Sequence, residues 1–107
     1  FFRVGKTFYG LEINIRPPGV VTLDMMNYSR GLDIWHEFAR LAAGEPGPVR
    51  ETRDLICAYV ARLNRLDYKW SHEEVMARHG NRIMFHAPMD SPVMGDYCYL
   101  FVANNHE

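Results

Sequence analysis

The chain has 107 residues, of which 48% are hydrophobic and 23% charged, and its net charge is −1 at pH 7. This length predicts one domain or part of one, and the near-neutral charge without a basic tract argues against nucleic acid as a partner. The longest uninterrupted apolar run, residues 55–61, is far shorter than the roughly 20 residues of a membrane span. We therefore expect no membrane partner either.

The two cysteines, Cys57 and Cys98, lie in apolar, strand-like surroundings. Such surroundings are typical of buried free thiols in a reducing compartment, so we expect a cytoplasmic protein. A disulfide between the two remains open. The chain starts in strand-like residues, Phe1-Phe2-Arg3-Val4, with no turn or helix cap before them. We expect a single domain, 1–107, that is a fragment of a longer protein.

Aromatic and β-branched residues predict strands over residues 1–4 and 7–15, joined by a tight turn at Gly5-Lys6. Pro17 restricts Arg16 to extended conformations, so Arg16 should continue the second strand. Pro18 and Gly19 then end it.

Two helices are expected next. Thr22 is suited to cap a helix that runs to about Ser29 and stops at Gly31. Asp33 is suited to cap a second helix that stops at Gly44. Five apolar residues of that second helix follow the spacing of one buried stripe, namely Ile34, Trp35, Phe38, Leu41 and Ala42.

The second half of the chain predicts alternating strands and one helix. The apolar run over residues 55–63 fits a buried strand or a buried helix, and its β-branched and aromatic residues favour the strand. Ser71-His72-Glu73-Glu74 is a capping box for a helix that ends at Gly80. Residues 82–86 and 97–103 predict two more strands. The whole order predicts an α+β fold with a mostly antiparallel sheet and two to three helices.

The candidate site lies on the second strand, where Glu12, Asn14 and Arg16 alternate with apolar residues. In an extended strand, alternate residues share a face. A carboxylate and a carboxamide provide the hard oxygen ligands of Mg²⁺, and an arginine beside them can bind a phosphate or a carboxylate. The alternative is that the same alternation marks only the solvated face of a half-buried strand.

The sequence Leu-Glu-Ile-Asn-Ile-Arg-Pro-Pro-Gly over residues 11–19 resembles the C-terminal part of ATP-grasp enzymes, in the carboxylate–amine ligase and biotin-carboxylase-like branch. The motifs Asp-Met-Met-Asn-Tyr at 24–28 and Leu-Asp-Ile-Trp at 32–35 add to the resemblance, which covers about residues 1–40. Position 20 departs from it, because Val20 stands where the family often has a second glycine.

The resemblance implies an ATP-dependent and Mg²⁺-dependent (or Mn²⁺-dependent) ligase that activates a small carboxylate as an acyl phosphate for attack by an amine. It implies that Glu12 and Asn14 ligate the metal ions that bridge the phosphates of ATP. Arg16 would steady the acyl phosphate or the substrate as the catalytic residue. Leu11 would contact the adenine, although strict alternation points Leu11 away from Glu12.

The resemblance further implies that residues 1–44 form the metal and substrate hairpin with its helices, and residues 50–107 a C-terminal strand–helix–strand segment of the ATP-grasp lobe. The family's glycine-rich loop, nucleotide-binding lysines and second acidic metal ligand would precede this chain, so we expect the isolated chain to be inactive. The rival interpretation is a non-catalytic α+β binding or assembly module. Exposed phenylalanines of the N-terminal hairpin also predict self-association.

Other chemistry-bearing residues carry weaker predictions. His72 and His79 lie seven residues apart on one predicted helix, but a third metal ligand is missing, and exposed helix histidines are the favoured interpretation. His86 lies on a strand without an evident partner. Tyr97, Tyr99 and Phe101 could stack against bases, but no Lys or Arg cluster surrounds them, so packing is favoured.

Overall fold

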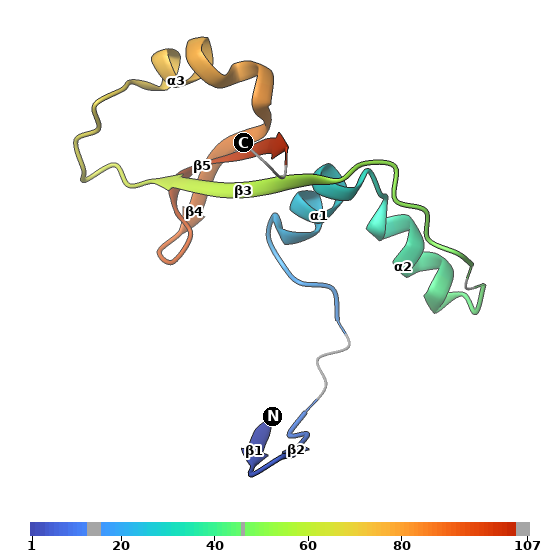
Figure 1. Cartoon of the computed structure of the whole chain (residues 1–107). Coiled ribbons are helices and arrows are strands. Elements are labelled where there is room, and N and C mark those ends of the chain that lie inside the picture. Colours follow the sequence, from blue (N-terminus) through green and yellow to red (C-terminus); the bar gives the residue numbers. More distant parts are fainter. Residues whose placement is uncertain (13–15, 46, 105–107) are drawn as a thin grey trace.

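The computed structural model of the chain describes residues 1–12, 16–45 and 47–104. Within these ranges the chain forms two antiparallel sheets and three α-helices, the α+β fold class expected from the sequence (Figure 1). In chain order the elements are β1 (Phe2–Val4), β2 (Thr7–Tyr9), α1 (Thr22–Arg30), α2 (Ile34–Ala42), β3 (Leu55–Arg62), α3 (His72–His79), the 3₁₀ turn η1 (Gly80–Arg82), β4 (Ile83–Ser91) and β5 (Gly95–Asn104).

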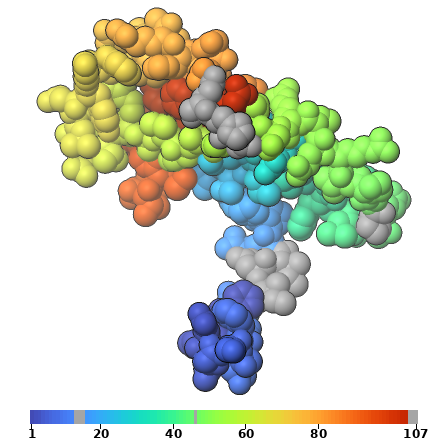
Figure 2. Space-filling view, in the orientation of Figure 1, coloured from blue at the N-terminus to red at the C-terminus, as the bar shows by residue number. Residues whose placement is uncertain are grey.

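The N-terminal hairpin, β1 and β2, stands apart from the other elements (Figures 1 and 2). Phe2 lies opposite Tyr9, and Gly5 turns the chain at a φ of +61°, so the predicted hairpin is confirmed. Its apolar side chains, Phe8 among them, are exposed. The radius of gyration, 17.8 Å, exceeds the roughly 13 Å of a compact chain of this length. Self-association through the hairpin stays a prediction.

In the larger sheet β5 is the central strand, with β3 on one side and β4 on the other. Both pairings are antiparallel. The strand predicted over residues 55–63 is confirmed at Leu55–Arg62. The other two strands are longer than predicted, because their pairing continues to Ser91 opposite Gly95. A backbone ladder does not depend on the polarity of the side chains at its end.

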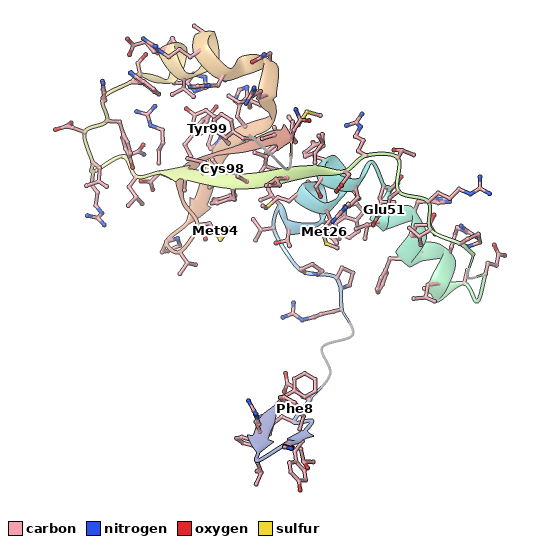
Figure 3. All side chains as sticks on the ribbon, viewed as in Figure 1. Phe8, Met26, Glu51, Met94, Cys98 and Tyr99 are labelled. Carbon is pink, nitrogen blue, oxygen red and sulfur yellow. The ribbon has the colours of Figure 1, made fainter. Side chains whose placement is uncertain are left out.

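The two faces of this sheet differ because successive residues of β5 point to opposite sides. Helices α1 and α3 lie on opposite sides of the sheet (Figure 1). Cys98 and Leu100 are fully buried on the α1 side, where Leu23 of α1 is also buried. Tyr99 and Phe101 alternate with them on the α3 side; Figure 3 labels Cys98 and Tyr99 on this strand. Most of the buried core therefore lies between α1 and the sheet, while Tyr99, only 2% exposed, is buried on the α3 side.

Cys57 and Cys98 are both free thiols, as the sequence predicts. Cys57 lies opposite Val102 and Cys98 opposite Ala61, so the two cysteines are not cross-strand partners. Burial raises the pKa of both thiols. A thiol with a raised pKa is a poor nucleophile at neutral pH, which argues against a catalytic role for either cysteine.

Helix α1 begins at Thr22, so the expected N-cap is wrong by one residue: Val21 takes that position and provides no side-chain cap. The helix ends as predicted at Gly31, which has a φ of +64°. The segment before β3 returns to this end of α1. The Thr52 N–H donates to the Arg30 carbonyl at 2.9 Å, and the Thr52 hydroxyl donates to the Gly31 carbonyl at 2.9 Å. These bonds set where β3 starts relative to α1.

Helix α2 begins after Asp33, whose carboxylate accepts a hydrogen bond from the His36 backbone N–H at 3.0 Å, as predicted. The predicted buried stripe is wrong, because Trp35 is 53% exposed and Leu41 62% exposed. Helix α2 contacts α1 and lies beyond the end of the sheet (Figure 1). Its apolar side therefore has no sheet face of the described chain to pack against.

Helix α3 begins with the predicted capping box. The Ser71 hydroxyl accepts from the Glu74 N–H at 3.2 Å, and the Glu74 carboxylate accepts from the Ser71 N–H at 2.8 Å. The box makes His72 the first residue of the helix.

None of the helices in the described ranges has the length and apolar character to cross a membrane.

Candidate functional site

The segment predicted to bind metal and substrate lies between the hairpin and α1. Strand β2 ends at Tyr9, and Gly10, Leu11 and Glu12 have no regular secondary structure. The prediction of one strand over residues 7–15 is therefore wrong for residues 10–12. The reason is the length of β1: its pairing ends at Phe2 opposite Tyr9, so the residues after Tyr9 have no β1 residue opposite them.

The predicted site residues Leu11, Glu12 and Arg16 are all exposed. Glu12 and Arg16 make no ion pair with another residue in the described ranges. Asn14, the second predicted metal ligand, lies outside the described residues, so its position relative to Glu12 is not described. The Glu12 carboxylate matches the oxygen chemistry of Mg²⁺ or Mn²⁺. Among the described residues, no three His, Cys, Asp or Glu side chains group to hold a metal ion.

The loop that leads into α1 has an unusual backbone at Val20, where φ is +59°. A left-handed conformation places Cβ close to the following carbonyl and costs a residue with a side chain roughly 1–2 kcal/mol. Glycine avoids this cost, and a β-branched residue is rare there. The backbone of this loop is thus shaped for glycine, although the sequence supplies valine.

A second group of polar side chains lies on the α3 face of the sheet. We call it the imidazole–phenol cluster; it consists of His72, His86, Tyr97 and Tyr99. His72 comes from the start of α3, His86 from β4 and both tyrosines from β5. Register brings them together: His86 lies opposite Tyr99, and the two tyrosines, two residues apart on β5, share a face.

Each imidazole of the cluster is hydrogen-bonded to one phenol. His72 Nδ1 lies 2.8 Å from the Tyr99 hydroxyl, and His86 Nδ1 lies 2.6 Å from the Tyr97 hydroxyl. The two imidazole centroids are 5.3 Å apart, and the two phenol centroids 5.2 Å apart. The four rings therefore form one contiguous polar-aromatic surface.

Burial raises the pKa of the Tyr97 phenol, and the neighbouring Tyr99 adds to the increase. Tyr97 is therefore protonated at neutral pH and can donate its proton to His86 Nδ1. In that arrangement His86 Nδ1 is the acceptor, and the ring carries its proton on Nε2. This hydrogen bond fixes the orientation of the His86 ring on this face of the sheet.

Two hollows adjoin the cluster. The smaller, of about 370 Å³, is lined by His72, Tyr97 and Tyr99 together with Arg62 and Asn64 after β3. The larger, of about 600 Å³, lies over β3 and β5 and is mostly apolar. Volumes of roughly 300–1,000 Å³ are typical of small-molecule sites.

Sequence reasoning missed this group. His86 was expected to lack a partner, but it binds Tyr97. The helix histidines were expected to be exposed, yet His72 bonds to Tyr99 and the His79 ring lies 6.1 Å from that of Phe101. The signal available in the sequence was the Tyr-x-Tyr-x-Phe alternation of β5, which marks a face able to receive aromatic and imidazole rings.

Comparisons of the chain with protein-family models, with curated proteins and with solved structures found no match to any of them.

Proposed function

We propose that this chain is the C-terminal part of an ATP-grasp ligase, in which residues 11–20 contribute to the metal and acyl-phosphate site. The main observation behind this proposal is the backbone of Val20, whose φ is +59°. It occupies the position at which the resembled family often has a second glycine. The backbone therefore takes the conformation suited to that glycine even though the side chain has changed, as expected if the loop shape is shared.

Two further observations support the proposal. Glu12 and Arg16 are exposed and make no ion pair with other described residues, so both are available to a cation and an anion. Helix α1 begins at Thr22 without a side-chain cap, which leaves backbone N–H groups at its start for an anion.

In this proposal Glu12 and Asn14 hold Mg²⁺ or Mn²⁺, whose bound charge neutralises the phosphates of ATP. Arg16 orients the carboxylate that is phosphorylated, and its guanidinium can bind the acyl phosphate through two parallel hydrogen bonds. Leu11 provides an apolar contact for the adenine. The free thiols of Cys57 and Cys98 support a cytoplasmic location.

The test uses the protein that carries this chain. Purified protein is incubated with Mg²⁺-ATP, a panel of small carboxylic acids and hydroxylamine, which traps an acyl phosphate as a hydroxamate. We expect ADP and hydroxamate from the unaltered protein, and a loss of at least about 100-fold for Glu12→Gln. The matched control is Glu45→Gln, another exposed glutamate, which should retain full activity.

Two outcomes would contradict the proposal. If no acid in the panel supports ATP turnover, the non-catalytic binding or assembly module, supported by the exposed apolar hairpin, becomes the better interpretation. If Glu12→Gln turns over ATP at the unaltered rate, residue 12 does not hold the metal.

The isolated chain should bind Mg²⁺-ATP barely or not at all, which calorimetry can check.

A further inference from the structure

The larger hollow on the α3 face, which we call the α3 hollow, is a concave site with an apolar floor. Its floor includes Val60 of β3, Tyr99 opposite it on β5, and Phe101 two residues further along β5. Val60 is 45% exposed on β3, an edge strand of the three-stranded sheet. The volume of about 600 Å³ suits an organic ligand rather than a single ion or water.

One wall of the α3 hollow consists of aromatic and apolar side chains outside the sheet. Trp70 precedes α3, and Val75 and His79 come from α3 itself. The His79 ring lies 5.9 Å from that of Trp70 and 6.1 Å from that of Phe101. These ring contacts hold the wall against the floor, so the hollow is largely formed before any ligand arrives.

Among the described residues that line the α3 hollow, each side chain with a full charge at neutral pH is basic: Arg62, Lys69 and Arg82. The Arg62 guanidinium lies 4.6 Å from the centre of the Tyr68 ring, and the Lys69 amine lies 5.9 Å from that of Trp70. Among the described residues neither cation forms a salt bridge with a carboxylate, although Arg62 is near enough to Glu73 to contribute to the lowered pKa of that carboxyl. Contact with a ring face leaves their N–H groups able to donate to an anion.

We propose that the α3 hollow binds an organic carboxylate with an extended apolar body. The apolar body would cover Val60 and Phe101, while the carboxylate would meet Arg62 and Lys69. Charge complementarity selects this class: Arg62 and Lys69 would repel an organic cation, and a neutral ligand would offer them no charge-assisted hydrogen bond. This inference rests on the α3 hollow alone and does not depend on the proposed ligase activity.

Tryptophan fluorescence provides a local readout. The chain has two tryptophans, and Trp35 lies on α2. In a Trp35→Phe background, Trp70 at the wall of the hollow is the single tryptophan. Decanoate, decyltrimethylammonium and decanol, each below its aggregation limit, are titrated into this variant. These three probes share one apolar chain and differ in the charge of the head.

We expect a saturable change in Trp70 fluorescence with decanoate, at an affinity at least about tenfold higher than for the cation or the alcohol, since a charge-assisted hydrogen bond contributes about 1.5–3 kcal/mol. Lys69→Gln and Arg62→Gln should each weaken decanoate binding by about fivefold or more. The matched control, Arg50→Gln, removes an exposed arginine that does not line the hollow and should change binding less than twofold.

The proposal is overturned if the three probes bind equally, if the decanoate signal does not saturate, or if Arg50→Gln weakens binding as much as Lys69→Gln. Because Lys69 is an exposed residue, its substitution should leave the fold intact, and circular dichroism of each variant verifies this. Lost decanoate binding with an unchanged spectrum supports the proposal.

Discussion

The N-terminal segment, residues 1–16, and the three-stranded sheet differ in how their candidate polar residues are brought together. In the N-terminal segment the polar chemistry is contiguous in the sequence, with Glu12 and Arg16 four residues apart, yet both are exposed outside any regular element. On the α3 face of the sheet the polar side chains come from three elements: strand register places His86 opposite Tyr99, and the start of α3 brings His72 next to them.

This difference shows that a sequence motif can suggest a site, whereas only the folded structure shows which side chains lie together. A short motif identifies the N-terminal segment as a candidate site, but nothing in the described chain packs against it. Strand pairing and the packing of α3 on the sheet together build the imidazole–phenol cluster and the α3 hollow from residues far apart in the sequence. Mutations should therefore affect function without much effect on stability in the first region, and affect stability strongly at the sheet. Figure 3 places Phe8 of the hairpin far from Cys98 and Tyr99 of the sheet.

The largest expected effect comes from the core of the sheet. Leu100 is fully buried, and Leu100→Ala should lower the free energy of unfolding by about 2–5 kcal/mol. Phe8 is 66% exposed, and Phe8→Ala should change it by less than about 0.5 kcal/mol. Urea unfolding followed by far-UV circular dichroism measures both. Equal destabilisation by the two variants would mean that the hairpin is part of the folded core.

Two glycines with the same backbone angle sharpen the comparison. Gly31 and Gly5 have φ of +64° and +61°. A Cβ on Gly31 would overlap the Thr52 hydroxyl, whereas a Cβ on Gly5 would meet nothing within 4 Å. The alanines of Gly31→Ala and Gly5→Ala would both be strained in the left-handed conformation. At Gly31 this strain and the overlap should cost about 1–3 kcal/mol of unfolding free energy. At Gly5 the strain can be released by local opening of the separate hairpin, so unfolding of the sheet in the same urea experiment should change by less than about 0.5 kcal/mol. A larger loss at Gly5 would contradict the separation of the two regions.

The smallest effect is expected at Val20, and its sign is opposite. Val20→Gly should raise the free energy of unfolding by up to about 1 kcal/mol, because relief of the left-handed strain exceeds the added entropy of the unfolded chain. Val49 is also exposed but has no positive φ, so Val49→Gly should be neutral or slightly destabilising. Thermal unfolding distinguishes the two. If both substitutions destabilise equally, the strain at Val20 is not real.

The sequence alone determined the local structure of this chain. Residue preference and capping chemistry predicted the N-terminal turn, the ends of three helices to within a residue or so, and the strand at 55–62, because each depends on neighbours a few positions away. The capping box at Ser71 and the helix end at Gly31 are examples.

Tertiary structure decided which side chains meet. Continuing the pairing of Ser91 with Gly95 would place His86 opposite Leu100, on the other face of the sheet. A register shift between Pro88 and Ser91 places it opposite Tyr99 instead. A slip of one residue reverses the face of every side chain in a strand, and local preferences do not encode it. The sequence also could not predict that the apolar side of α2 is exposed. An apolar stripe predicts which side chains a helix can bury, but not whether another element lies beside it.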